Sequence, residues 1–248
     1  MKPEKKNIRG VYFDNVTLDE ADALLDECFE AGEQTAVFTP NSEIVQCCID
    51  KPEMYEIINS AELIVPDGIG VIKAAKILGT PLKCKVAGVE LGERVVKKAH
   101  DHGRKLFFLG GKPGIAEAAA AKLAEKYGDL TVVGTNDGYF TKTGEENDAV
   151  IEKINASCAE VLFVCLGAPA QENWIFANRS RLPGVKIMLG LGGSLDVYSD
   201  TVKRAPKVFV KLGLEWFYRL IKEPKRIGRM MSLPKFYFGT ILYKLGRK

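Results

Sequence analysis

One acidic residue stands where a catalytic base would be expected. Asp67 directly follows the apolar run 63–65 and precedes the glycine-bearing step Gly68-Ile69-Gly70. A carboxylate held within hydrogen-bond reach of a substrate hydroxyl can accept its proton, so Asp67 is the candidate general base. The alternative is structural, because an Asp-Gly pair is also typical of a turn.

Polar residues and glycines follow the other apolar runs of the chain in the same way. Thr39 and Asn41 come after 35–38, and Gln171 opens a helical stretch after a proline-bearing loop. Each of the three is a candidate for ligand contact, with helix capping as the structural alternative. Glycines at strand ends let backbone N–H groups approach a phosphate, and a helix that starts just beyond adds its positive end. The glycine-bearing segments 110–114, 136–139 and 190–193 therefore favour a nucleotide or diphosphate ligand.

Spacing excludes several familiar chemistries. The chain has no GxGxxG and no GxxxxGK[ST], which argues against a nicotinamide or ATP site. The segment 192–196 lacks the closing glycine of the GxSxG hydrolase elbow. His100 and His102 are the only histidines, so neither a histidine-based triad nor a zinc centre is expected, and the chain has no DxD. We therefore expect no cofactor and no metal, and a diphosphate leaving group would be stabilised by Arg, Lys and backbone N–H groups.

The residues before position 200 alternate short apolar runs with amphipathic stretches. This alternation is typical of βαβ units, so we expect an α/β, Rossmann-like fold with a mostly parallel sheet and helices on both faces. The first helix has a capping box at Thr17 and Glu20 and is expected to end near Gly32. The expected strands are 9–13, 35–38, 63–65, 105–109, 131–133, 161–166 and 185–189. The further expected helices are 42–50, 71–78, 91–100, 115–127, 145–157 and 171–181.

The net charge of +3 conceals a strong asymmetry along the chain. Residues 203–248 contain thirteen Lys and Arg against two Glu, a net charge of +11, whereas residues 1–202 carry −8. The C-terminal segment also holds eight of the 22 aromatic residues. We therefore expect an α/β catalytic domain at 1–202 and a basic, aromatic, helical appendage at 203–248. Arg219, Arg226 and Arg229 are spaced so that they lie near one helical face if Pro224 only kinks the helix.

The C-terminal segment predicts a partner of negative charge. Basic residues interleaved with aromatic rings favour an anionic membrane surface, and a solvated basic face is the structural alternative. Nucleic acid is the competing polyanion, but we expect none, because the body is acidic and carries no nucleic-acid-binding motif. No apolar run reaches eighteen residues and none follows the basic N-terminus, so neither a spanning nor a secretory segment is expected. The six cysteines lack CxxC spacing and suit buried thiols in the reducing cytoplasm.

Nine segments together carry a resemblance to the WecG/TagA/CpsF family of glycosyltransferases, and within it to the TagA branch. They cover nearly the whole chain, and the last of them is long and highly specific. The segments are TPNSEIV (39–45), PDGIGVIKAAKILG (66–79), VAGVEL (86–91), FFLGGKPG (107–114), NDGYF (136–140), GAPAQENWI (167–175), GGSLDV (192–197), KRAPKVF (203–209) and GLEWFYRLIKEPKRIGRM (213–230).

The resemblance implies an enzyme peripheral on the inner face of the cell membrane. It would transfer a sugar from a UDP-sugar to polyprenyl-diphosphate-linked N-acetylglucosamine, with inversion and without a metal. In the TagA branch the sugar is N-acetylmannosamine, joined by a β-1,4 bond in the linkage unit of wall teichoic acid. The resemblance also implies a homo-oligomer that associates through the body.

Matched position by position, the resemblance assigns roles to residues already singled out. Asp67 corresponds to the general base, and the tail arginines to groups that reach the diphosphate when the appendage docks. The residues implied as catalytic are Asp67, Thr39, Asn41, Gln171, Arg219, Arg226 and Arg229. The residues implied in UDP-sugar binding are Lys85, Gly110, Gly111, Gly138, Tyr139, Gly192, Gly193 and Asp196. Lys85 departs from the family, whose members usually carry Arg there, and it keeps the charge but loses the planar bidentate fork.

Two alternative functions remain open from the sequence. One is a member of the same family that transfers another UDP-sugar, such as N-acetylmannosaminuronic acid, glucose or galactose. The other is a non-catalytic nucleotide-sugar-binding protein tethered to the membrane by the C-terminal segment.

Overall fold

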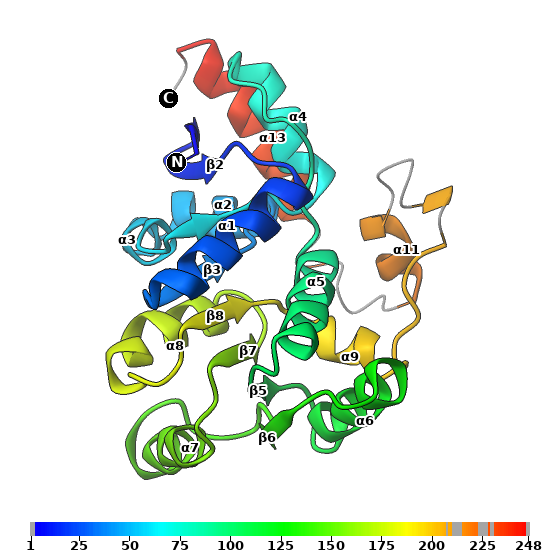
Figure 1. The fold of residues 1–248 in the computed structure, drawn as a ribbon. Coiled ribbons are helices and arrows are strands. Elements are labelled where there is room, and N and C mark those ends of the chain that lie inside the picture. The colour runs from blue at the N-terminus through cyan, green and yellow to red at the C-terminus, as the bar shows by residue number, and fades with distance from the viewer. Residues whose placement is uncertain (1–2, 207, 210–214, 223–227, 229–230, 247–248) are drawn as a thin grey trace.

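The computed structural model describes residues 3–206, 208–209, 215–222, 228 and 231–246. The described chain is built around a six-stranded sheet in the order β4-β3-β8-β7-β5-β6, in which every pairing is parallel (Figure 1). The strands are β3 (Thr35–Phe38), β4 (Leu63–Ile64), β5 (Leu106–Gly110), β6 (Val132–Asn136), β7 (Val161–Cys165) and β8 (Ile187–Gly190). Because all six run the same way, their carboxyl ends lie along one edge of the sheet. The expected α/β, Rossmann-like fold is confirmed.

Helices cover both faces of the sheet, as strands buried on both sides require. Alternate residues of each strand serve two separate cores: Ala36 and Phe38 of β3 face one, and Val37 faces the other. One face is covered by α2 (Ser42–Asp50), α3 (Met54–Asn59), α4 (Ile69–Leu78), α7 (Gly144–Ala156) and α8 (Ala170–Asn178). The other is covered by α1 (Leu18–Ala31), α5 (Gly88–Asp101), α6 (Ile115–Tyr127) and α9 (Ser194–Tyr198).

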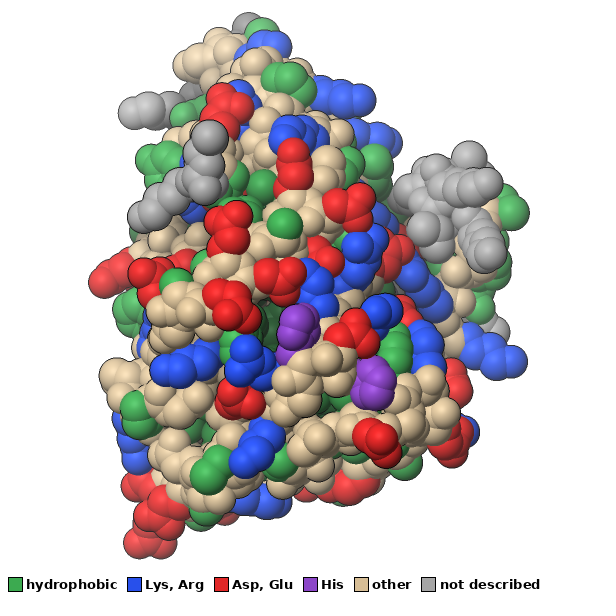
Figure 2. Space-filling view, viewed as in Figure 1, with side chains coloured by type: hydrophobic (Ala, Val, Ile, Leu, Met, Phe, Trp, Pro, Cys, Tyr) green, Lys and Arg blue, Asp and Glu red, His purple; other side chains and the backbone are tan. Residues whose placement is uncertain are grey.

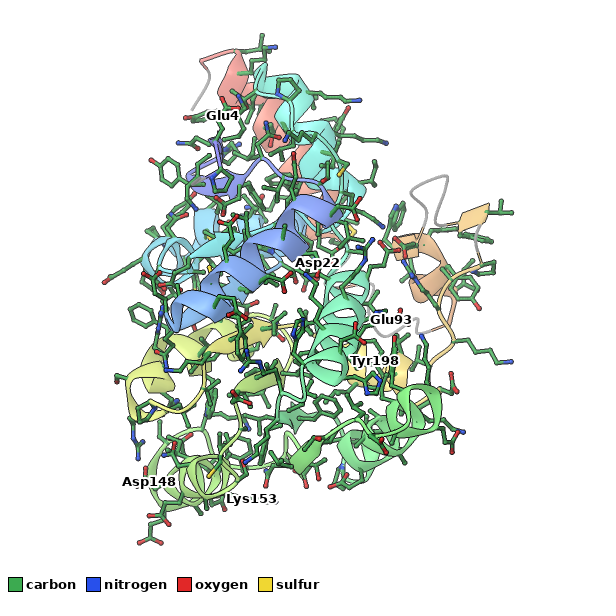
Figure 3. The ribbon with its side chains drawn as sticks, viewed as in Figure 1. Glu4, Asp22, Glu93, Asp148, Lys153 and Tyr198 are labelled. Carbon is green, nitrogen blue, oxygen red and sulfur yellow. The ribbon has the colours of Figure 1, made fainter. Side chains whose placement is uncertain are left out.

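The local signals read from the sequence set several of these boundaries. Thr17 and Glu20 form the expected capping box at the start of α1, and Gly32 ends the helix in the left-handed conformation with φ of 69°. Helices α2 and α6 begin and end at the expected residues. Asp22 lies on the side of α1 that faces α5, where its Oδ1 is 3.1 Å from Nζ of Lys98 (Figure 3). This ion pair adds to the apolar contacts between α1 and α5.

The structure corrects the expected elements in several places. The expected strand at 9–13 is instead an antiparallel hairpin of β1 (Lys5–Ile8) and β2 (Val11–Asp14), because Arg9 and Gly10 adopt positive φ angles and form the turn. The expected helix 171–181 ends as α8 and continues as the 3-10 turn η1 (Arg179–Arg181). The short helices α3 and α9 were not expected.

Two helices of the C-terminal segment lie in different places. Helix α13 (Ser232–Lys244) packs against α2 and α4, whereas α11 (Glu215–Lys222) stands apart from the sheet in the same view (Figure 1). Within the described ranges, no helix is both long and apolar enough to cross a bilayer.

Candidate active site

Thr39 stands at the junction of two neighbouring strands. It is the first residue after β3, and its Oγ1 donates a hydrogen bond to the carbonyl oxygen of Gly190, the last residue of β8, at 3.2 Å. Helix α5 begins against the same side chain, since a Cβ placed on Gly88 would lie 3.0 Å from Thr39 Oγ1. Thr39 is therefore buried, and its hydroxyl proton is used to join the ends of β3 and β8.

Asn41 caps the helix that follows. Its Oδ1 accepts hydrogen bonds from the backbone N–H groups of Glu43 and Ile44 at 2.9 and 3.2 Å, at the N-terminus of α2. This confirms the capping alternative for the side-chain oxygen, and the amide nitrogen takes no part in the cap. A Cβ on Gly68 would lie 3.7 Å from Asn41 Cβ, so Asn41 borders the Asp67 loop.

Asp67 lies on a loop that backbone hydrogen bonds hold on two sides. Its own N–H donates to the carbonyl oxygen of Pro40 at 3.3 Å, and the N–H of Val86 donates to that of Pro66 at 2.9 Å. Gly68, with φ of 88°, then turns the chain into α4. The half-buried carboxylate thus stands at the carboxyl edge of the sheet, between the Asn41 cap and the segment that contains Lys85.

A group of opposite charges surrounds this loop. Lys85 pairs with Glu215 of α11, and Arg204 pairs with Glu90 of α5. Arg204 Nε also lies 3.8 Å from Glu215 Oε1, yet it is buried without a hydrogen-bond partner. Burial opposes the charge on Arg204, but Glu90, Glu215 and Asp67 outweigh burial and raise its pKa. Arg204 therefore lies within reach of the Asp67 charge, and both Lys85 and Arg204 lie beside the Glu215 carboxylate of α11.

Gln171 forms hydrogen bonds that hold the backbone just after β8, and we call these contacts the Gln171 brace. Its Oε1 accepts a hydrogen bond from the Gly192 N–H at 2.8 Å, and its Nε2 donates to Glu172 Oε1 at 2.9 Å. Helix α8 has no side-chain cap, so the capping alternative for Gln171 is wrong. Gly190 leaves room for the Gln171 side chain, since a Cβ there would lie 3.1 Å from Nε2.

The glycines at the other strand ends pack closely on one another. A Cβ on Gly110 would lie 2.2 Å from the Cys165 carbonyl oxygen, so no other residue fits there without a shift of the backbone. The Gly111 N–H donates to that same oxygen at 3.2 Å, and the Gly138 N–H donates to the Gly111 carbonyl oxygen at 2.8 Å. The N–H groups of Gly111 and Gly138 are thus satisfied within the protein.

The remaining expected donor-site residues line the same edge. Tyr139 follows β6, and its side chain is 70% exposed. Gly193 is exposed at the start of α9, where a Cβ would lie 3.4 Å from Asp196 Oδ2. Gly192 and Gly193 therefore lie along the sheet edge between Gln171 and Asp196.

Three expected residues cannot be placed at the site. Arg226 and Arg229 lie outside the described residues, as does the side chain of Arg219. No group of three His, Cys, Asp or Glu side chains within the described ranges is arranged to hold a metal ion.

A cavity of about 230 Å³ lies at the opposite end of the sheet, between α1 and α5, where Val161 and Ile187 begin their strands. Lys98, His102 and Arg104 are among the residues that line it. Figure 2 shows this face, on which acidic and basic side chains are interspersed around the two histidines. The cavity contains none of the expected site residues.

Comparison with known proteins identifies the family. The model of the glycosyl transferase WecG/TagA/CpsF family matches residues 6–248. The chain belongs to this glycosyltransferase family. It is 36% identical over 237 residues, 94% of this chain and 91% of the relative, to the N-acetylglucosaminyldiphosphoundecaprenol N-acetyl-beta-D-mannosaminyltransferase of Staphylococcus aureus strain MRSA252. The proteins of the same name from strains MW2 and NCTC 8325 match with the same identity and coverage.

In this WecG/TagA/CpsF protein, Thr39 and Asn41, Asp67, and Gln171 come from three separate segments that meet at one edge of the sheet. Sequence reasoning missed Arg204 and Glu172 as members of the cluster. Arg204 was visible only as one cation of a basic segment, although it lies in the KRAPKVF stretch that carries the resemblance. Glu172 likewise lies in a stretch that carries the resemblance, GAPAQENWI, but nothing in the sequence distinguished it from its neighbour Gln171.

Proposed function

We propose that the protein transfers N-acetylmannosamine from UDP-N-acetylmannosamine to undecaprenyl-diphosphate-linked N-acetylglucosamine. The product is the β-1,4-linked disaccharide-lipid of the wall teichoic acid linkage unit. The 36% identity to transferases of that name, over 94% of the chain, carries the choice of substrates. The position of Asp67 beside Asn41 and near Arg204 supports the choice of catalytic base.

In the proposed reaction Asp67 accepts the proton of the N-acetylglucosamine hydroxyl as its oxygen attacks the anomeric carbon of the donor. The bond to UDP breaks on the opposite face, so a single displacement inverts that carbon. The negative charge on the departing UDP is stabilised by Lys85 and Arg204, with Arg219, Arg226 and Arg229 as further cations. Lys85 and Arg204 already hold the carboxylate of Glu215, so both are oriented toward an anion before the substrate binds.

The donor is proposed to lie along the edge formed by the ends of β5, β6, β7 and β8. Its diphosphate approaches Gly110, Gly111, Gly192 and Gly193, where the absence of side chains allows close contact. Gly138, Tyr139 and Asp196 complete the donor site, and the exposed Tyr139 ring is available to stack on the uracil base. Metal independence is part of this proposal, because Lys and Arg take the place of a divalent ion.

The C-terminal segment is proposed to bring this site to the lipid acceptor. On α11, Trp216, Phe217 and Ile221 are 38%, 42% and 57% exposed. On α13, Phe238 and Leu242 are 66% and 46% exposed. Exposed apolar side chains on a basic segment suit peripheral attachment to the anionic inner face of the membrane. The boundary at residue 203 and a homo-oligomer formed through the body belong to the same proposal.

The test is transfer with a panel of UDP-sugars and a lipid-diphosphate N-acetylglucosamine acceptor, with and without EDTA. UDP-N-acetylmannosamine should give the disaccharide-lipid in both conditions. Product only with another UDP-sugar would assign the chain to a different member reaction. Product lost on chelation would overturn the metal-free mechanism.

The role of Asp67 is tested by Asp67→Asn with Asp148→Asn as the matched control. Loss of a general base lowers kcat by about 10²- to 10⁴-fold, and UDP binding measured by calorimetry should be retained. Asp148 lies on α7 and pairs with Arg181, away from the site, so its variant should keep wild-type activity. Full activity in Asp67→Asn would exclude Asp67 as the base.

A further inference from the structure

A fully buried carboxyl group lies directly behind the Gln171 brace. Glu172 is 0% exposed, although acidic side chains are almost never buried without a partner. Its Oε1 accepts the hydrogen bond from Gln171 Nε2, and its Oε2 is buried with no hydrogen-bond partner among the described residues. A buried carboxyl oxygen without a hydrogen-bond partner lowers the stability of the folded protein. Glu172 is therefore a candidate for a functional role.

The hydrogen bond to Glu172 sets the orientation of the Gln171 side-chain amide. The Gly192 N–H can only donate, so the oxygen of the Gln171 amide must face it. The amide nitrogen then points to the other side, where it needs an acceptor, and Glu172 Oε1 is that acceptor at 2.9 Å. Without this acceptor, the amide loses the contact that holds it in one orientation.

The contact continues across the edge of the sheet. Gln171 fixes Gly192, two residues after Gly190, and the Gly190 carbonyl oxygen accepts the hydrogen bond from Thr39. Gly190 has no side chain to separate it from Gln171 Nε2. A connected series of contacts therefore runs from Glu172 on α8, through the end of β8, to Thr39 after β3.

We infer that Glu172 is a positioning residue of the active site: its carboxyl group holds the Gln171 amide so that Gln171 fixes the Gly192 backbone where the donor diphosphate binds. This inference rests on the proposed function for the identity of the ligand. Glu172 touches no substrate and acts through Gln171.

The same carboxyl group makes the brace sensitive to pH. Burial raises the Glu172 pKa from 4.5 to about 7, against the opposing effect of the Gln171 hydrogen bond. Since Oε2 has no partner, the proton resides there, and Oε1 remains an acceptor in both forms. A charged acceptor forms the stronger hydrogen bond, so the brace is tighter when Glu172 is ionised.

The thiols and the phenol near Glu172 have raised pKa values. Burial raises the pKa of Cys48 and Cys165 to about 12, and it also raises that of Cys47 and Tyr55. The charged side chains of η1 are engaged elsewhere, in the Arg179–Glu62 and Arg181–Asp148 pairs, and Glu56 is exposed. The titratable or charged groups on the neighbouring elements are Glu43, Cys47, Cys48 and Asp50 of α2, Tyr55 and Glu56 of α3, Cys165 of β7, and Arg179 and Arg181 of η1.

The experiment compares Glu172→Leu, which removes the acceptor, with Glu172→Gln, which keeps an acceptor but cannot ionise. In Glu172→Leu, protection of the Gly192 amide against hydrogen exchange should fall about tenfold, and the Kd for UDP and the KM for the donor should rise about tenfold. In Glu172→Gln all three should stay within about threefold, and the inflection near pH 7 in the wild-type KM profile should disappear. Glu62→Gln, at the opposite end of β3, is the matched control and should change none of them.

Each outcome bears on the inference. Unchanged Gly192 protection and UDP affinity in Glu172→Leu would overturn it, even if sugar transfer proceeds. If Glu172→Leu fails to fold, the Glu172→Gln variant provides the test. An inflection near pH 7 that persists in the KM profile of Glu172→Gln would show that Glu172 does not make the Gln171 contact sensitive to pH. Failure of the proposed function is seen separately, as a wild-type protein that forms no disaccharide-lipid from any donor, because amide exchange and UDP binding are measured without turnover.

Discussion

The two helices of the C-terminal segment are held by different kinds of interaction. Helix α13 buries Phe236 and Thr240 against α2 and α4, and its Phe236 is 1% exposed. Helix α11 has no buried side chain among those described. Its Glu215 pairs with Lys85 of the body and lies 3.8 Å from Arg204, which in turn pairs with Glu90 of the body. Burial of a large side chain resists salt, whereas a partly exposed ion pair is weakened by it.

The basic segment therefore contains two helices with different modes of attachment. Helix α13 belongs to the packed core although it lies in the charged, aromatic part of the chain. Helix α11 is attached next to Asp67 by charges that a diphosphate can replace.

The largest effect is expected from Phe236→Ala. Removal of a fully buried ring costs about 3–5 kcal/mol of unfolding free energy, because a cavity remains between α13, α2 and α4. Urea denaturation measures this cost. Phe238→Ala, which removes a ring that is 66% exposed on the same helix, should change the unfolding free energy by less than about 0.5 kcal/mol. Equal effects of the two variants would show that α13 is not part of the core.

A buried charge in the body gives the next largest effect. The raised pKa of Glu172 means that the folded protein binds this proton more tightly than the unfolded chain does. Its contribution to stability is therefore fully present below pH 4.5 and is lost as the pH rises through about 7, a change of roughly 3 kcal/mol. In Glu172→Gln, the unfolding free energy at pH 8 should exceed that of the wild type, and the difference should vanish near pH 4. A difference that does not depend on pH would contradict the assignment.

The attachment of α11 is tested by Glu215→Gln. Loss of the pairs with Lys85 and Arg204 should raise amide exchange in residues 215–222 about two- to fivefold, which corresponds to about 0.5–1 kcal/mol. Exchange in α13 should not change. High salt should bring the wild type close to the variant, and insensitivity of α11 to both salt and mutation would show that other contacts hold it.

The smallest effect is expected from Lys235→Ala on α13. Lys235 pairs with Asp50 at 2.7 Å, but the two side chains are 61% and 43% exposed. Solvent screens such a pair, so the unfolding free energy should fall by less than about 0.5 kcal/mol. A loss as large as that of Phe236→Ala would reverse the comparison between the two helices.

Much of the fold was predictable, because it depends on local patterns. Apolar runs located the six strands of the parallel sheet, and the capping box at Thr17 located the start of α1. The hairpin was missed because its first strand, Lys5–Ile8, is short and mostly polar. Helix α13 was not placed on the core because its sequence is apolar all round and gives no sign of which face is buried.

The site was predictable in its location but not in its partners. Strand-end residues such as Thr39 and Asp67 could be found because parallel strands end along one edge. The contacts of Glu172 with Gln171, and of Lys85 with Glu215, could not be found, since each depends on tertiary packing or joins distant parts of the chain. The capping role of Asn41 is local and was foreseen as an alternative.

One close contact of α13 has a practical consequence for anyone who modifies the protein. Gly70, three residues after Asp67, packs directly on Ser42 at the start of α2, and Leu233 of α13 is the next neighbour at 3.7 Å from the position of a Cβ. The final helix thus adjoins the first turns of both α2 and α4. A substitution on this face of α13 therefore reaches the start of the helix that follows Asp67, so variants made for kinetic work should leave Leu233 unchanged.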